Sequence, residues 1–330
     1  MLTEFIAQIP FHGWTESPFE YSEDPFLERV LKEVTDLSGK LAFPLDIYGT
    51  CYPEFEIHDD WSPISVVWSN VGCRDNPVLG IKFAMEIPQK APPPDSHCPP
   101  EDADTYHCGA IGRQLCQRAL DFATILGLVR PGKYRVGPGE VYADGQLVED
   151  VRAFNPPLDL ALEAIADLGW PRLSDRPINE LWSWAMGREG FLSQFGGNRI
   201  DRAFTAYSHL GSENGADLFW AMLAIESLFT RTNIAVKDQV VHNTQLLLGE
   251  LPAIKKRLDR MYDFRSRLIH GDMDFPGAFW GWDDGKEFDS YEKGYDASLG
   301  LAIAIIIATF QELAHRGWNE LRFKYVLDQP

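Results

Sequence analysis

Residues 252–271 read PAIKKRLDRMYDFRSRLIHG, and this stretch decides the fold of the C-terminal half of the chain. Apolar side chains and one arginine recur in it at alternating steps of four and three residues: Ile254, Leu258, Met261, Arg265 and Leu268. That spacing places the five side chains on one face of an α-helix. A glycine directly after such a period is a frequent helix C-cap. We therefore predict a helix over residues 252–270 that packs through this stripe and ends at Gly271.

Further helical periods follow the same pattern along the C-terminal half. They predict helices over residues 179–192, 199–210, 216–231, 236–248 and 289–315. Short connections between so many helices indicate a bundle. Residues 173–330 are therefore predicted to form an all-α domain.

The first 172 residues have a different, mixed α/β character. Helical periods occupy residues 28–37 and 109–128, and residues 41–57 and 64–87 carry β-rich runs such as 64–68 and 79–83. The proline-rich residues 88–104 predict an exposed loop. The fold class expected for the chain is α+β, with a mixed α/β domain over residues 1–172 followed by the helical bundle over residues 173–330.

The composition is that of an ordinary globular protein, with 45% hydrophobic and 24% charged residues among 330. The N-terminus has no basic segment followed by an apolar one, which argues against a signal peptide. The longest apolar run, residues 299–310, is too short to span a bilayer and predicts a buried helix. The five cysteines all lie in the first 120 residues, and their odd number argues against a closed disulfide framework. We expect a cytoplasmic protein.

The formal net charge of −19 argues against a nucleic-acid partner, but the charge is unevenly distributed. Residues 1–170 contain 12 Lys and Arg against 27 Asp and Glu, whereas residues 255–270 contain six basic residues against two acidic ones. A local positive field can draw phosphates into one cleft of an acidic protein. The candidate RNA-binding residues are Lys255, Lys256, Arg260 and Arg267. The alternative is a solvated helix face.

Two charged residues fall on predicted apolar stripes. Arg265 lies on the stripe of the 252–270 helix, and Glu226 lies on a stripe of the 216–231 helix with Phe219, Met222 and Phe229. Because a lone charge is costly in an apolar setting, we expect Glu226 and Arg265 to face each other across the bundle. A structural buried ion pair would explain the same placement.

The rest of the 252–270 helix adds groups that can do chemistry. Tyr262, Ser266 and His270 are spaced by four residues and share one face, next to Arg265. Histidine can exchange a proton near neutral pH, and arginine can stabilise a pentacovalent phosphorane. These groups can cleave RNA without a metal if one histidine removes the 2′-hydroxyl proton and another protonates the leaving oxygen. A two-fold dimer would supply the second histidine.

The segment Met261–Gly271 resembles the Arg-x4-6-His signature of the HEPN superfamily. Its form Tyr-x-x-Arg-Ser-x-x-x-His-Gly is similar to the Apea-like branch, and residues 223–228, Leu-Ala-Ile-Glu-Ser-Leu, resemble the helix that precedes the motif in those domains. The likeness covers residues 180–315. It implies a helical bundle that dimerises with its Arg and His motifs lining a cleft. Many members are metal-independent endoribonucleases in toxin, phage-defence or stress systems, and others are inactive binding or dimerisation modules.

Carried over to this chain, the resemblance implies that Arg265 and His270 are catalytic, with Glu226 orienting Arg265 and Ser266 at the small polar position after it. Tyr262 would support the same site. The leading hypothesis is a homodimeric endoribonuclease that needs no cofactor. The second is a non-catalytic HEPN module that binds RNA, a nucleotide or a protein partner, and the third is a purely structural or DNA-mimicking acidic protein.

The first 172 residues resemble no family, and a sensor, a substrate selector or an inhibitor-facing domain are the roles considered for them. One cluster there could in principle hold zinc: His97, Cys98, His107 and Cys108. Adjacent residues rarely both reach one metal ion, and the usual Cys-x2-Cys spacing is missing. We therefore expect no metal at this cluster.

Overall fold

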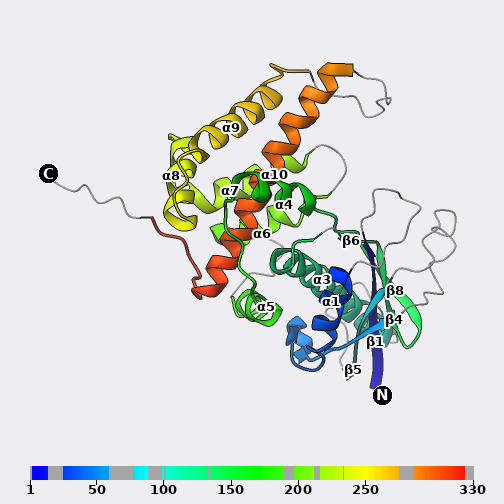
Figure 1. The fold of residues 1–330 in the computed structure, drawn as a ribbon. Helices are drawn as coiled ribbons and strands as arrows, with labels where there is room; N and C mark the ends of the chain where they lie inside the picture. Colours follow the sequence, from blue (N-terminus) through cyan, green and yellow to red (C-terminus); the bar gives the residue numbers. More distant parts are fainter. Residues whose placement is uncertain are drawn as a thin grey trace. The chain divides into compact units, whose positions relative to one another are not determined.

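The computed structural model describes residues 2–13, 25–58, 77–87, 99, 102–132, 134–188, 197–211, 216–232, 234–274 and 285–323. The chain divides into two compact units, which are described separately (Figure 1). Unit 1 contains Met1–Asn155 and Pro177–Met186, and unit 2 contains Pro156–Arg176 and Gly187–Pro330. The division is therefore not a single cut at residue 172. Residues Pro156–Arg176 belong to unit 2, and the chain then returns to unit 1 for Pro177–Met186.

Unit 1 is built on an antiparallel sheet. Its strands are β1 (Leu2–Gly13), β4 (Glu54–His58), β5 (Val78–Glu86), β6 (Tyr134–Val136), β7 (Gly139–Ala143) and β8 (Gln146–Val151). The order is β4-β5-β1-β7-β8, and β6 pairs with the end of β1. Alternate residues of β1 are fully buried, among them Phe5, Ala7 and Ile9, as expected for a strand with one face on the core. Phe5 pairs in register with Phe83 of β5, and their rings stack at 5.4 Å.

Helices complete unit 1. They are α1 (Pro25–Thr35), α3 (Ala103–Val129) and α5 (Ile178–Met186), and a hairpin of β2 (Phe43–Pro44) and β3 (Thr50–Cys51) encloses the short 3-10 helix η1 (Asp46–Tyr48). The ring centroid of Trp182 on α5 lies 4.6 Å from that of Phe43 and 5.6 Å from that of Phe122. Its indole N–H donates to the carbonyl oxygen of Ala42 at 2.9 Å. This aromatic anchor is why α5 belongs to unit 1.

Unit 2 is a helical bundle. It contains α4 (Leu158–Leu168), α6 (Arg199–Tyr207), α7 (Asp217–Phe229), α8 (Val236–Leu248), α9 (Ile254–His270) and α10 (Gly285–His315). The segment 299–310 of α10 is buried throughout, and α4, α7, α8 and α9 all contact this helix. Gly300 permits the closest approach, since a Cβ atom there would collide with the carbonyl oxygen of Leu160 on α4. The predicted buried helix is therefore the centre of the bundle.

The part of α10 over Asp289–His315 is long and apolar enough to cross a membrane by length and composition alone. However, 89% of its most apolar window is buried inside the protein. A core helix of a soluble protein has the same properties, and the fold is compatible with that assignment.

The predicted α+β fold class is confirmed, and so are the helices predicted in residues 173–330. The 236–248 helix has the predicted bounds, whereas α5 ends at Met186 rather than at residue 192. The strands β2 to β4 and β5 lie in or begin in the β-rich residues 41–57 and 64–87, whereas α4, β1 and the β7–β8 hairpin were not predicted. Residues 64–68 and most of the proline-rich segment lie outside the described residues, so those two predictions are not tested.

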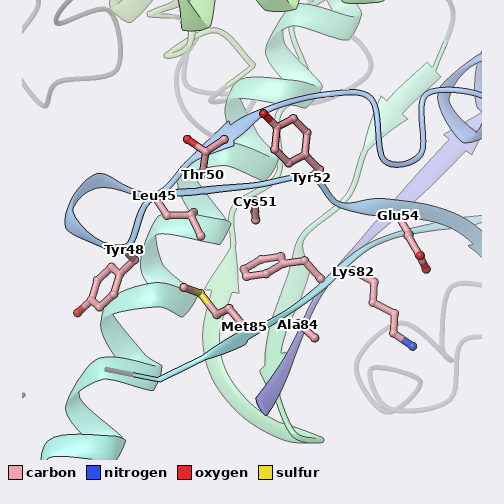
Figure 2. A pocket seen from close by; sticks show the side chains of 10 residues that line it. Leu45, Tyr48, Thr50, Cys51, Tyr52, Glu54, Lys82, Ala84 and Met85 are labelled. Atoms are coloured by element: carbon pink, nitrogen blue, oxygen red, sulfur yellow. The ribbon is translucent and has the colours of Figure 1, made fainter. Parts of the chain in front are cut away.

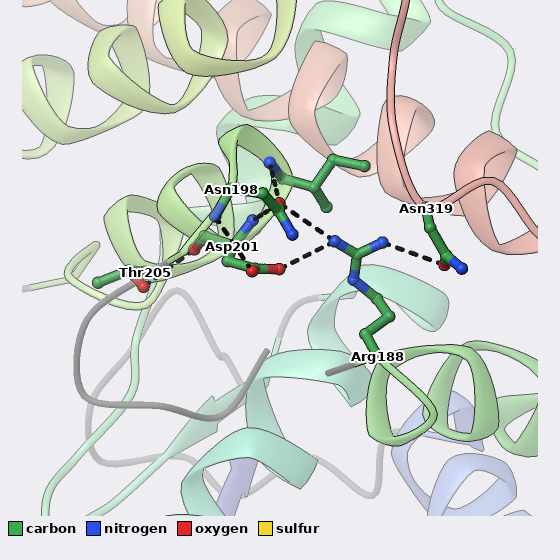
Figure 3. Close-up of polar contacts among 6 residues, drawn as sticks. Arg188, Asn198, Asp201, Thr205 and Asn319 are labelled. Carbon is green, nitrogen blue, oxygen red and sulfur yellow. Dashed lines mark hydrogen bonds and ion pairs between the residues drawn. The ribbon is translucent and has the colours of Figure 1, made fainter. Parts of the chain in front are cut away.

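A buried ion pair ties together two ends of unit 2 (Figure 3). Arg188 donates to Oδ1 of Asp201 at 2.9 Å, and their side chains are only 3% and 1% exposed. The same guanidinium donates to Oδ1 of Asn198 and Oδ1 of Asn319, each at 3.2 Å. Asn198 is also the N-cap of α6, where it accepts from the backbone N–H groups of Ile200 and Asp201. The arginine thus links the start of α6 to the segment that follows α10.

We predict that Arg188→Met lowers the free energy of unfolding by about 3–5 kcal/mol, because it leaves the Asp201 carboxylate buried without its partner. Chemical denaturation of the whole protein measures this change. Arg322→Met is the matched control, since Arg322 pairs with Glu320 on the surface. It should leave the stability unchanged, and an equal loss in the two variants would contradict the assignment.

Candidate functional site

The candidate site is built on α9, whose first part is anchored in the core. Ile254, Leu258 and Met261 are fully buried, as their spacing predicted. The helix ends at Gly271, which has a φ of 73° and donates its N–H to the carbonyl oxygen of Arg267. The predicted stripe and the predicted glycine C-cap are both confirmed.

Glu226 on α7 and Arg265 on α9 face each other, as expected from their stripes. Their nearest charged atoms are 3.9 Å apart, which is an ion pair but too long for a hydrogen bond. The two side chains are 23% and 31% exposed, so the pair is not fully buried. Partial burial raises the pKa of Glu226, and the opposing charge of Arg265 lowers it by less.

The stripe predicted on α7 is wrong in one respect. Met222 and Phe229 are fully buried, but Phe219 is 47% exposed. The buried side of α7 is centred on residues such as Leu218 and Ile225, so Glu226 lies at the border between the core and the surface. This position explains the partial exposure of the ion pair.

Tyr262 is one turn before Ser266 and is 7% exposed. Its hydroxyl has no hydrogen-bond partner in the described part of the chain, and the same holds for Nε of Arg265. Burial raises the pKa of Tyr262, and the nearby Glu226 raises it further. A buried polar atom without a partner is costly. Both atoms are enclosed by the protein, so they are buried donors beneath the site rather than groups on its surface.

Ser266 and His270 lie on the exposed side of the same helix. His270 follows Arg265 by five residues, which corresponds to about 7.5 Å along the helix axis. Five residues also correspond to a rotation of about 140° around the axis, so the two side chains leave the helix in different directions.

The predicted RNA-binding residues form an exposed basic face. Its members are Lys255, Lys256, Arg260 and Arg267, all exposed and none in an ion pair within the described residues. The acidic residues of the helix are engaged elsewhere, because Nζ of Lys237 on α8 lies 2.9 Å from Asp259 and 3.5 Å from Asp263. The charge of the basic face is therefore not cancelled by its own helix.

An aromatic cluster beside the site was not found from the sequence. The ring of Phe264 lies 5.7 Å from that of Tyr291 and 6.4 Å from that of Tyr295, both on α10. Gly294 makes room for it, since a Cβ atom there would lie 2.8 Å from the ring of Phe264. The spacing of the two tyrosines by four residues, with a glycine between them, was the signal available in the sequence.

Two residues of the candidate zinc cluster, His97 and Cys98, lie outside the described residues. His107 on α3 is buried, and its Nδ1 is hydrogen-bonded to the hydroxyl of Tyr48 at 2.8 Å. Within the described ranges, no three His, Cys, Asp or Glu side chains are grouped so that they could hold a metal ion.

Comparison of the chain with known protein families, with curated proteins and with solved structures gave no match.

The partial burial of Glu226 leads to a stability prediction. A raised pKa means that folding favours the protonated carboxyl, so this group's contribution to stability is present at low pH and is lost as the pH rises through the folded pKa. Glu226→Gln should therefore be neutral or stabilising, by less than about 1 kcal/mol at pH 8, with the difference disappearing near pH 4. Urea denaturation at the two pH values tests it. A loss of about 3 kcal/mol or more would instead identify a buried structural pair.

Proposed function

We propose that the protein is a metal-independent endoribonuclease whose Arg265 and His270 site is completed in a homodimer. The observation that carries the proposal is the partly exposed guanidinium of Arg265, which lies 3.9 Å from the carboxylate of Glu226 on the helix that also presents the exposed basic face. Because this ion pair is partly exposed, the guanidinium can also contact a phosphate that approaches from solvent.

The roles follow from the chemistry of each group. One His270 removes the proton of the 2′-hydroxyl, whose oxygen attacks the adjacent phosphorus. The bond between phosphorus and the 5′-oxygen breaks, and the His270 of a second copy protonates the leaving oxygen. Arg265 stabilises the charge of the phosphorane, with Tyr262 and Ser266 in support. The products are a 2′,3′-cyclic phosphate and a 5′-hydroxyl.

The basic face would hold the RNA strand. Its residues repeat along α9 so that Lys256, Arg260 and Arg267 point to the same side of the helix. Phosphate contacts of this kind supply affinity without sequence preference. The remaining acidic surface would discourage RNA from binding elsewhere.

Exposed apolar side chains support the homodimer. Phe219 and Leu223 are 47% and 39% exposed on the stripe of α7 that leads to Glu226, and Ile269 is 49% exposed next to His270. Phe219 and Leu223 are one helical turn apart on the same face of α7, and exposed apolar side chains so placed favour an interface. A two-fold contact through this surface would bring a second α9 to the site and provide the second histidine.

A non-catalytic module remains the second candidate. The separation of Arg265 from His270 along the helix favours it, because a binding site needs only the arginine and the basic face. In either case the protein is expected in the cytoplasm, as a toxin or an antiviral defence effector. Unit 1 would then serve in sensing, substrate selection or control by a protein inhibitor or trigger.

We predict that the purified protein cleaves single-stranded RNA in excess EDTA and leaves 2′,3′-cyclic phosphate ends. Arg265→Ala and His270→Ala should each reduce cleavage by at least 100-fold, a loss typical for one catalytic acid–base or charge-stabilising group. His242→Ala, an exposed histidine on α8, is the matched control and should keep full activity. Cleavage that requires magnesium, or ends that carry a 5′-phosphate, would refute the mechanism. RNA binding without cleavage would favour the second candidate.

We also predict that the protein is a dimer at micromolar concentration and that Phe219→Glu converts it to a monomer, with loss of cleavage. Sedimentation velocity measures the change of state. Leu246→Glu is the control, because Leu246 is an equally apolar residue, 58% exposed on α8. A wild-type protein that sediments as a monomer, or a dimer insensitive to Phe219→Glu, would contradict the proposed interface.

A further inference from the structure

Unit 1 contains a cavity of about 370 Å³ that the proposed RNA chemistry does not use (Figure 2). It lies where β5 continues past the start of β4: Glu54 pairs with Lys82, and the next residues of β5, Phe83 to Met85, form one wall. The opposite wall is the β2–β3 hairpin and the residues that follow it. The size is that of a site for a small molecule rather than a protein partner.

Apolar and aromatic side chains form part of the wall of the cavity, and Thr50, Glu54 and Lys82 add polar groups. Leu45 and Met85 line it together with the rings of Tyr48, Tyr52 and Phe83. Figure 2 shows Tyr48 and Tyr52 at two separate edges, with Leu45 and Cys51 between them. Aromatic faces carry negative electrostatic potential and attract cations. The lining therefore suits a ring or an alkyl group that carries a positive charge.

The charged end of the cavity favours a cation as well. Lys82 is engaged, because its Nζ lies 2.9 Å from the carboxylate of Glu4. Glu54 is exposed at the rim and has no ion pair within the described residues. The pKa of Lys82 is raised, first by its hydrogen bond to Glu4 and then by carboxylates that include Glu56 and Glu54. Because Glu4 pairs with Lys82, the Glu54 carboxylate is left as an additional negative charge at this end of the cavity.

The cavity is held in shape by contacts outside it. The hydroxyl of Tyr48 is hydrogen-bonded to the buried His107, and Phe83 stacks on Phe5. The turn between β2 and β3 is closed by a hydrogen bond from the N–H of Leu45 to the carbonyl oxygen of Gly49 at 2.7 Å. Gly49 has a φ of 93°, a conformation that favours glycine. A preformed site loses less entropy when a ligand binds.

From these observations we infer that unit 1 is a ligand-binding unit whose cavity takes a small organic cation, an aromatic or alkyl amine, with the ammonium group beside Glu54 and the apolar part against Tyr52. Cys51 does not compete as a charged group, because burial raises the pKa of its thiol to about 12. This inference does not depend on the proposed ribonuclease activity.

Calorimetric titration of the full chain with three probes of equal size tests the inference. The probes are 2-phenylethylamine, 2-phenylethanol and phenylacetate, which at pH 7.5 differ mainly in charge. The ammonium probe should bind at least tenfold more tightly than the other two. Glu54→Gln should weaken it at least fivefold and leave the alcohol unchanged, whereas Glu28→Gln, at an exposed position of α1, should change neither.

Tyr52→Leu gives a second measurement in the same titration. It should weaken binding of the ammonium probe, because it removes an aromatic face from the wall of the cavity. Equal or tighter binding of phenylacetate would overturn the inference. So would the absence of binding at 10 mM of the ammonium probe.

Discussion

The burial of α10 is the constraint on which unit 2 depends. Its segment 299–310 is apolar on every side, so neighbouring helices must cover it completely. The helices α4, α7, α8 and α9 do so, and each turns its own apolar face inward. The glycine at position 300 sets how closely α4 can approach. The outward faces of α7 and α9 are then left for charged and polar groups, and the candidate site forms at their border with the core.

Much of this unit was predictable from the sequence, because its helices are long and their apolar periods are regular. The pairing of Glu226 with Arg265 was predictable for the same reason, since each charge falls near an apolar stripe. The degree of burial was not predictable. A stripe of apolar residues predicts which side of a helix faces the core, but not how wide the buried face is. The exposed Phe219 shows that the core side of α7 is rotated relative to the predicted stripe. The ion pair therefore has weaker energetic consequences than a fully buried one.

Less of unit 1 could be predicted from the sequence, because the order of its strands depends on contacts between residues far apart in the chain. The alternation of Phe5, Ala7 and Ile9 in β1 is visible, but nothing local pairs that strand with β5 and β7. The anchor of α5 in this unit depends on Trp182 packing against Phe43, about 140 residues earlier in the chain. The cavity was missed for the same reason, since its two walls come from residues 45–54 and 82–85.

The glycine at the end of α9 has a geometric consequence for the histidine before it. Gly271 adopts a left-handed conformation that other residues rarely take, so it fixes the residue at which the helix stops. Successive side chains of a helix are rotated by about 100° about its axis. An end one residue earlier or later would change which side chain occupies the last turn and the direction in which it leaves the helix. Gly271 thus determines the direction in which the imidazole of His270 points.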